Sequence, residues 1–300
     1  MSTSDAFASA SRDDRAALIG YLPAGFPSVE GSITALRVMA ESGCDVIEVG
    51  LPYSDPVMDG SAVEAAARLA LQRGFRTRDV FHVVEEVSKS GVDVVVMSYW
   101  NLIERYGSGR FARDLSAAGG AGVVTPDLPF ENASAWVTET DQRSLDHIFL
   151  VAPSSADHRL KATALHCSGF VYATAVMGVT GVRAGKSDLA EPLVKRARAV
   201  TNLPIAVGIG VSNGEQAAEI ATFADGVIVG SAFVRAIETG RGNPAVSIAD
   251  LRTVSQLAAG LATAARRPAR GARRQAPIKG KAQCVADGPT ERTQRPSEDH

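Results

Sequence analysis

The feature that most constrains the fold of this chain is a repeated alternation of short apolar runs with longer, helix-like segments. The apolar runs are rich in β-branched residues, and most of them are continuous instead of alternating with polar residues. Strands that are buried on both faces have this composition, which predicts a parallel sheet covered by helices. The expected strands cover residues 17–22, 45–49, 92–97, 122–125, 147–151, 170–173, 205–208 and 226–229.

The segments between these runs carry apolar residues at helical spacing. The expected helices cover residues 28–40, 62–73, 78–88, 133–140, 156–166, 214–222, 232–238 and 248–265. Six of them follow a residue that can cap a helix N-terminus, namely Ser61, Thr77, Asn132, Ser155, Asn213 and Ser247. Eight strands alternating with helices over about 250 residues predict a single-domain (β/α)8 TIM barrel, here residues 1–265. The alternative is a doubly wound open sheet, which typically has about five or six strands.

Residues 266–300 differ in composition from the rest of the chain. They hold nine basic and four acidic residues, which leaves 22 basic and 29 acidic residues in 1–265. The segment lacks apolar periodicity and is rich in Arg, Pro and Gly, so we expect a disordered tail. The acidic body argues against nucleic-acid binding by the barrel. The basic tail is interpreted as an untethered terminus, with contact to nucleic acid or an acidic partner as the alternative.

Cysteine spacing and hydropathy exclude several other classes of protein. Cys44, Cys167 and Cys284 are far apart, which predicts neither a disulfide framework nor a metal site. No apolar stretch approaches about 18 residues, and the first residues lack the apolar region of a signal peptide. We therefore expect a cytoplasmic protein that does not enter a membrane. Motifs of metalloproteases, esterases, P-loop proteins and Rossmann folds are absent from the sequence.

Two carboxylates stand out at the end of the second expected strand. Glu48 interrupts an apolar run, where period two places it on one face with Val46 and Gly50. Burial would raise its pKa toward the range of a proton donor, whereas the alternative is a structural glutamate paired with Lys or Arg. Asp59 follows in the next loop and could divide acid and base roles with Glu48. Asp55, before a proline, is interpreted on its own as a turn residue.

Glycines cluster after the last three expected strands. Gly208 and Gly210 end the seventh strand, Gly230 and Ser231 follow the eighth, and Gly178 and Gly181 lie in the loop after the sixth. Loops at these places often bind phosphate in (β/α)8 barrels, so we expect a phosphate site, with ordinary turn glycines as the alternative. Tyr172 lies on the sixth strand, where the residue alone favours a core aromatic over a substrate contact.

With these residues in place, the sequence resembles the alpha subunit family of tryptophan synthase. The most specific segment is DVIEVGLPYSDPVMDG at 45–60. Four shorter matches are YLPAGFP at 21–27, MSYWN at 97–101, MGVTGVR at 177–183 and DGVIVGSA at 225–232. The resemblance runs from about residue 17 to 265 in the same order. Ser61 and Trp100 depart from the family pattern, as does the basic tail.

The resemblance implies a carbon–carbon or carbon–oxygen lyase that cleaves indole-3-glycerol phosphate to indole and glyceraldehyde 3-phosphate in tryptophan biosynthesis. Glu48 would donate a proton to indole C3, and Asp59 would bind the indole N–H. Tyr172, Tyr21, Met97 and Val124 would contact the substrate, and Gly181, Gly210, Gly230 and Ser231 would bind its phosphate.

The same resemblance implies a partner. Pro52, Asp55 and Asn101 would face a tryptophan synthase beta subunit in an α2β2 heterotetramer, and that subunit would receive the indole. Pyridoxal phosphate would belong to the beta subunit, and this chain would carry no cofactor. Two alternatives stay open: another phosphate-binding barrel isomerase or synthase, and a non-catalytic subunit that activates its partner.

Overall fold

The computed structural model describes residues 2–174, 187–237 and 245–266. They lie in one compact unit, Met1–Ala269, whereas Arg270–His300 falls outside the described residues. The expected tail at 266–300 is therefore described only at Arg266, which forms an isolated antiparallel bridge with Arg15. Among the described residues, no helix has both the length and the apolar character needed to cross a membrane.

Parallel strands form the centre of the molecule. The described residues form nine strands in the order β5-β4-β3-β2-β1-β9-β8-β7-β6. All of the observed pairings are parallel, as the continuous apolar runs predicted. The strands are β1 Ala17–Pro23, β2 Val46–Gly50, β3 Asp93–Met97, β4 Gly122–Val124, β5 Asp146–Ile148, β6 Leu150–Val151, β7 Val171–Thr174, β8 Ile205–Gly208 and β9 Gly226–Val229.

The two ends of this strand order belong to one segment of the chain. Only Phe149 separates β5 from β6, so the fifth expected strand, at 147–151, is present in two parts. Its first part pairs with β4 and its second part with β7, which closes the sheet into a barrel. The eight predicted strands and the (β/α)8 barrel are thereby confirmed, and the open sheet is excluded.

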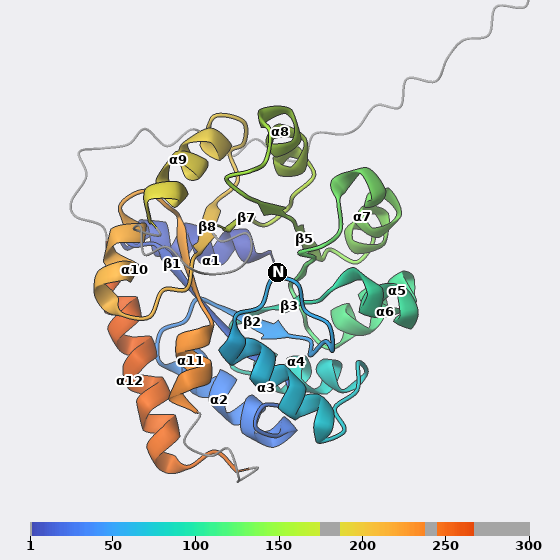
Figure 1. Ribbon diagram of the computed structural model, residues 1–300, viewed down its shortest axis with the longest axis vertical. Helices are drawn as coiled ribbons and strands as arrows, with labels where there is room; N and C mark the ends of the chain where they lie inside the picture. The colour runs from blue at the N-terminus through green and yellow to red at the C-terminus, as the bar shows by residue number, and fades with distance from the viewer. Residues whose placement is uncertain (1, 175–186, 238–244, 267–300) are drawn as a thin grey trace, which may run out of the picture. The chain divides into compact units, whose positions relative to one another are not determined.

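Helices surround the strands (Figure 1). They are α1 Thr3–Arg12, α2 Val29–Glu41, α3 Ser61–Gln72, α4 Asp79–Ser88, α5 Trp100–Tyr106, α6 Ser108–Ala117, α7 Ser134–Asp141, α8 Asp157–Leu165, α9 Ser187–Arg198, α10 Gly214–Ala221, α11 Ser231–Ala236 and α12 Ile248–Ala264, with a 3-10 turn at Phe130–Asn132. Each of the expected helices is present within a few residues. Helices α1, α5, α6 and α9 were not predicted from the sequence.

The expected N-caps were right at two positions. Asn213 accepts a hydrogen bond from the Gln216 amide, and Ser247 forms a reciprocal capping box with Asp250. The other four expectations were wrong, because the chain enters each helix one residue away from the expected cap. The observed N-caps are Gly60, Arg78, Ala133 and Ala156, and none of them makes a side-chain capping bond.

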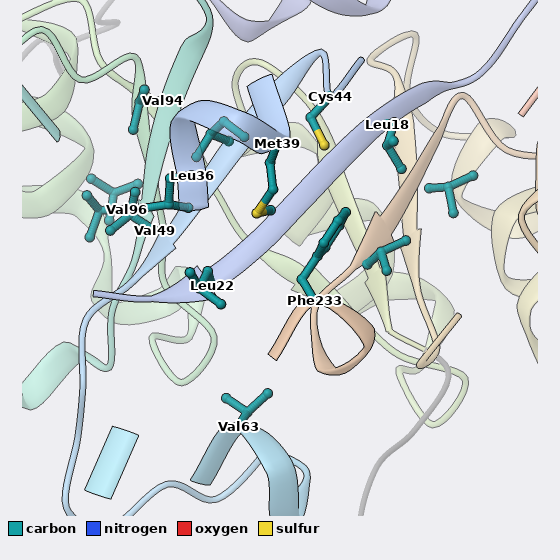
Figure 2. Close-up of a cluster of buried hydrophobic side chains, with 14 of the residues drawn as sticks. Leu18, Leu22, Leu36, Met39, Cys44, Val49, Val63, Val94, Val96 and Phe233 are labelled. Carbon is teal, nitrogen blue, oxygen red and sulfur yellow. The ribbon is translucent and has the colours of Figure 1, made fainter. Parts of the chain in front are cut away.

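Apolar side chains fill the space between the sheet and the helices. Figure 2 shows part of this outer cluster, in which Met39 of α2 and Phe233 of α11 lie against β1. Gly20 of β1 makes this close packing possible, because a Cβ there would collide with the ends of Met39 and Cys44. Cys44 and Cys167 are buried free thiols, and Cys284 lies outside the described residues.

A second cluster fills the barrel interior. It takes one residue in two from the strands, including Ile19, Val46, Val95 and Ile228, and it also contains Phe7 and Ala10 of α1. The Phe7 ring lies 5.2 Å from that of Phe170, just before β7. Helix α1 therefore closes the amino-terminal end of the barrel, and the carboxyl ends of the strands are left as the open end, where active sites of this fold lie.

Candidate active site

Glu48 lies inside the barrel. It is the third residue of β2, paired in register with Tyr21 of β1 and Val95 of β3. Its neighbour Val46 belongs to the interior cluster, whereas Ile47 and Val49 belong to the outer one, as the period-two pattern predicted. The side chain is 1% exposed. A carboxyl group is thus held within the barrel by its strand neighbours.

The carboxyl group of Glu48 lacks any compensating contact among the described residues. Neither oxygen has a hydrogen-bond partner there, and no described Lys or Arg pairs with it. The alternative of a glutamate neutralised by a basic residue is therefore not what this part of the chain shows. Burial first, and the charge of Asp59 second, raise the pKa of Glu48 to about 8. The group is mostly protonated at neutral pH.

Asp59 lies in the loop between β2 and α3 and is half-buried. Burial raises its pKa to about 6, a hydrogen bond from Tyr99 lowers it, and the charge of Glu64 raises it. The Tyr99 hydroxyl lies 3.4 Å from Asp59 Oδ1. The charge of Asp59 helps to raise the pKa of Glu48, and the two pKa values differ, so at pH 7 Asp59 is mostly ionised while Glu48 is mostly protonated.

Two tyrosines complete this interior layer. Tyr21 and Tyr172 both pack against the interior cluster, and burial raises the pKa of each. Both phenols also feel the charges of Glu48 and Asp59, which places the four groups in one electrostatic neighbourhood. The structure therefore brings Tyr172 to the carboxylates, where the residue alone had favoured a core role.

Glycines make room for these two rings. A Cβ on Gly50 or Gly230 would collide with Tyr21, and a Cβ on Gly208 would collide with Tyr172. Gly208 was expected to serve the phosphate loop, but its position on β8 is explained by the close approach of the Tyr172 ring. This assignment of a glycine to a neighbouring side chain needs the three-dimensional contact and cannot be read from the sequence.

Met97 and Val124 are the last residues of β3 and β4, and they lie one layer of residues beyond Glu48 toward the carboxyl end of the barrel. Register pairs Gly50 with Met97 and Met97 with Val124, so these residues form the next layer toward the carboxyl end. Val124 is fully buried in the interior cluster, and Met97 packs against it while half-buried. They supply an apolar wall in the layer next to Glu48, and their contact with a substrate stays a prediction.

The expected phosphate residues are partly described. Gly230 is the N-cap of α11, Ser231 is its first residue, and Gly230 lies against Tyr21. Gly210 lies two residues beyond β8, is exposed, and has φ +77°, a conformation that favours glycine. Gly181, together with the MGVTGVR segment, lies outside the described residues. Gly230 thus packs against the Tyr21 ring, whose phenol feels the charges of Glu48 and Asp59, and Ser231 follows it in the chain.

The residues expected to face a partner do not share one environment. Asp55 and Asn101 are exposed, and the Asn101 side-chain amide donates to the Tyr53 hydroxyl at 3.3 Å. This bond joins the loop after β2 to the start of α5. Pro52, in contrast, is buried within the chain. No group of three or more side chains among the described residues could hold a metal ion.

Tyr99 is a site residue that was not predicted from the sequence. It directly contacts Asp59, yet a tyrosine after a buried strand is typical of a core aromatic. Its only signal was its place in MSYWN, one of the segments that resemble the alpha subunit family. That segment was recognised as a whole, without a role for this hydroxyl.

Comparison with known proteins agrees with this geometry. The sequence matches the profile of the family described as Tryptophan synthase alpha chain over residues 7–264. The tryptophan synthase alpha chain of Nocardia farcinica is 57% identical over 234 residues, which cover 78% of this chain and 88% of the relative. That of Salinispora arenicola is 53% identical over 261 residues, 87% of this chain and 97% of the relative.

Solved structures give the same result. A chain of Mycobacterium tuberculosis tryptophan synthase superposes with a TM-score of 0.81 at 48% identity, covering 88% of this chain and 98% of that one. Tryptophan synthase subunit alpha of Legionella pneumophila has a TM-score of 0.78 at 28% identity, covering 88% and 98%. These matches favour neither another phosphate-binding isomerase or synthase nor a non-catalytic activating subunit. The chain belongs to the tryptophan synthase alpha chain family.

Proposed function

We propose that this chain is the lyase that cleaves indole-3-glycerol phosphate to indole and glyceraldehyde 3-phosphate by a retro-aldol reaction in tryptophan biosynthesis. Family membership supports the reaction, and one observation in the chain itself carries the proposal. Glu48 is buried inside the open end of the barrel with both carboxyl oxygens unpaired among the described residues. A buried carboxyl without a structural partner is a group kept available for a substrate.

Glu48 is the proton donor. Its pKa of about 8 leaves it mostly protonated at neutral pH, as a general acid requires. The proton goes to indole C3, and the bond between C3 and the glycerol carbon then breaks with its electron pair returning to the indole ring. The hydroxyl on that glycerol carbon becomes the aldehyde as its proton leaves. The carboxylate that Glu48 becomes after donation is a base that can accept this proton.

Asp59 is the partner of the indole nitrogen. Protonation at C3 places positive charge on the ring, which strengthens the N–H as a hydrogen-bond donor. With a pKa of about 6, Asp59 is mostly ionised at pH 7 and accepts that N–H. An interaction that grows as charge develops stabilises the transition state more than the bound substrate. The two carboxylates thus take different roles because their environments differ.

The remaining residues bind the substrate. Tyr21, Tyr172, Met97 and Val124 provide the interior wall against which the indole ring lies, and their packing around the carboxylates supports this role. Gly210, Gly230, Ser231 and Gly181 bind the phosphate, in the loops where barrels of this kind often hold one. Phosphate binding away from the reacting bond anchors the substrate, so that binding energy orients the bond to be broken.

The product indole passes to a tryptophan synthase beta subunit in an α2β2 complex in the cytoplasm. Exposed Asp55 and Asn101 contact this partner, and the bond from Asn101 to Tyr53 supports a single surface formed by two loops. Pro52 is buried, so its role is to shape the loop that carries Asp55. Pyridoxal phosphate belongs to the beta subunit, and no step assigned to this chain requires it.

Indole release tests the proposal. The purified chain is incubated with indole-3-glycerol phosphate, with and without a cognate beta subunit, and indole is measured. We expect release by the wild type in both cases and its loss in Glu48→Gln. A folded wild type that releases no indole in the complex would contradict the proposed reaction. A Glu48→Gln variant with wild-type turnover would contradict only the role given to Glu48 and would leave the proposed reaction standing.

A further inference from the structure

The Tyr99 hydroxyl contacts three groups of one loop. The backbone amides of Val57 and Met58 donate to it at 3.2 and 3.1 Å, and Asp59 Oδ1 lies 3.4 Å away. The mechanism proposed above uses Asp59 and gives Tyr99 no part. The three contacted residues are consecutive in sequence. The side chain of Tyr99, which follows β3, therefore holds the loop segment 57–59, and this segment ends at Asp59, the residue expected to bind the indole N–H.

The direction of these bonds follows from the chemistry of a hydroxyl group. A phenol has one proton to donate and two lone pairs to accept with. The amides of Val57 and Met58 can only donate, so they occupy the acceptor side of Tyr99. The phenol proton is therefore free for Asp59, whose ionised carboxylate can only accept. Tyr99 donates to Asp59, and such a bond favours the ionised form of the acid.

The side chain of Tyr99 is more deeply buried than the loop it contacts. Tyr99 is 6% exposed, and its ring centroid lies 5.0 Å from that of Tyr53. Ser98 Oγ donates to the Tyr99 carbonyl at 3.0 Å, and the next amide, of Trp100, donates to Asp127 at 2.8 Å. Val57 is, in contrast, 75% exposed. A fixed hydroxyl and an exposed loop make Tyr99 the anchor.

We propose that Tyr99 is a positioning residue for the lyase reaction, one that keeps Asp59 ionised and aimed at the indole nitrogen by anchoring the loop at 57–59. This inference depends on the proposed function, because it deepens the role given there to Asp59. The 3.4 Å separation is long for a hydrogen bond, as bonds in a site without substrate often are before they tighten.

The other groups around Asp59 show why this donor matters. Glu48 of β2 and Glu64 of α3 are acids, and Tyr21 and Tyr172 are the other ionisable groups coupled to Asp59 in the barrel. Burial and the charge of Glu64 disfavour a charged Asp59, whereas Glu48 is protonated and uncharged in the range where Asp59 ionises. The Tyr99 hydroxyl opposes these effects. Without it, the pKa of Asp59 rises.

The test is the pH profile of kcat/KM for indole release by the complex with Tyr99→Phe, which keeps the ring and removes the hydroxyl. Activity requires ionised Asp59, so it falls as pH drops below the pKa of Asp59. We expect that acid limb to move up by about one pH unit, from about 6 to about 7, which lowers kcat/KM about fivefold at pH 6 and less than about twofold at pH 8.

Tyr106→Phe is the matched control. The Tyr106 hydroxyl donates to Asp114 at 2.7 Å, so this variant breaks the same kind of bond between α5 and α6, outside the site. Its acid limb should coincide with that of the wild type. In an Asp59→Asn background, Tyr99→Phe should change kcat/KM by less than about twofold, since its effect acts through Asp59. The inference is overturned if the acid limb of Tyr99→Phe is unshifted. It is also overturned if Tyr99→Phe lowers kcat/KM as much in the Asp59→Asn background as it does in the wild type.

Two measurements do not depend on turnover. The side-chain carboxyl carbon of Asp59, followed by NMR, should titrate at a higher pH in Tyr99→Phe than in the wild type. Equal midpoints overturn the inference even if the proposed reaction itself proves wrong. In the wild type, the Val57 and Met58 amides should be protected from hydrogen exchange; exchange at unprotected rates overturns it even if Tyr99→Phe does not fold.

Discussion

The two ends of the barrel each bury a carboxylate, and they treat it in opposite ways. At the amino-terminal end, Asp146 is 7% exposed and accepts hydrogen bonds from the Thr3 amide at 2.8 Å, Thr3 Oγ1 at 2.9 Å and Ser2 Oγ at 3.1 Å. Toward the carboxyl end, Glu48 is 1% exposed and has no hydrogen-bond partner among the described residues. Burial alone does not distinguish the two groups.

The difference lies in what each carboxylate is bound to. Asp146 holds the start of α1 over the end of the barrel, so its hydrogen bonds belong to the fold. Gly169 allows this contact, because a Cβ there would collide with Thr3 and Asp146. Glu48 is left without such contacts, at a cost in stability that a group with only a structural role would not retain. The unsatisfied acid marks the reactive end of the barrel, and the satisfied one marks its structural end.

The largest expected effect is on activity. Glu48→Gln removes the transferable proton with almost no change in volume, so we expect indole release to fall by roughly 10³-fold or more. Substrate affinity should stay within about tenfold, because the change affects the transition state more than binding. Both quantities follow from steady-state kinetics together with equilibrium binding of the substrate.

Asp146→Asn is the matched control at the other end, with the same exchange of a carboxylate for an amide. It should keep indole release within about twofold of the wild type under conditions where it is folded, since Asp146 belongs to the structural end. A loss of activity in folded Asp146→Asn comparable to that of Glu48→Gln would remove the distinction between the two ends.

The second effect is on stability, and it has opposite signs at the two ends. Asp146→Ala leaves the Thr3 amide and hydroxyl without their acceptor, so the free energy of unfolding should fall by about 3 kcal/mol. Glu48→Gln should instead raise it at pH 9 by up to about 5 kcal/mol, at about 1.4 kcal/mol per unit of raised pKa. Chemical denaturation at fixed pH gives both values.

The increase in the free energy of unfolding caused by Glu48→Gln depends on pH, because folding changes how strongly Glu48 binds a proton. The pKa of Glu48 is raised from 4.5 to about 8 by folding, so the folded chain binds more protons than the unfolded chain between these values. Wild-type stability therefore falls as pH rises through this window, and Glu48→Gln lacks that contribution. The gain should shrink toward zero near pH 5. A gain that is equal at pH 5 and pH 9 would contradict a raised pKa.

The smallest expected effect concerns residues 268–300, which lie outside the described residues. We propose from their composition that these residues contribute no folded structure, so deleting them should shift the thermal midpoint by less than about 2 °C. Differential scanning calorimetry of the full and shortened chains makes the comparison. A drop of ten degrees would show that these residues pack on the barrel.

The strands of this fold were predictable because their signal is local. Parallel strands buried on both faces leave continuous apolar runs, and all eight runs are found as strands within about one residue. Helix α1 could not be predicted in this way, because its segment is mostly polar and only Thr3, Phe7 and Ala10 are buried. Their partners, Phe170 and Asp146, lie far along the chain, so no pattern within the segment reveals them.

The site residues likewise divide into those that local sequence pattern predicts and those that depend on contacts between distant parts of the chain. The sequence placed Glu48 on an interior face and Asp59 in the adjoining loop, since both follow from strand period and chain order. That Glu48 lacks a partner could not be predicted, because pairing depends on residues brought together only by closure of the barrel. The hydroxyl of Tyr99 was overlooked for a related reason: its three contacts come from a different loop.

The pKa of Glu48 decides whether this residue can serve as the proton donor at neutral pH. Its carboxyl carbon can be followed by NMR in the wild-type chain from pH 4 to 10, with Glu48→Gln identifying the resonance. We predict a midpoint near pH 8 and an alkaline limb of kcat/KM at the same pH, because the proton donor is lost there. A midpoint near 4.5, the ordinary value for glutamate, would contradict the claim that the barrel keeps this acid protonated for the reaction.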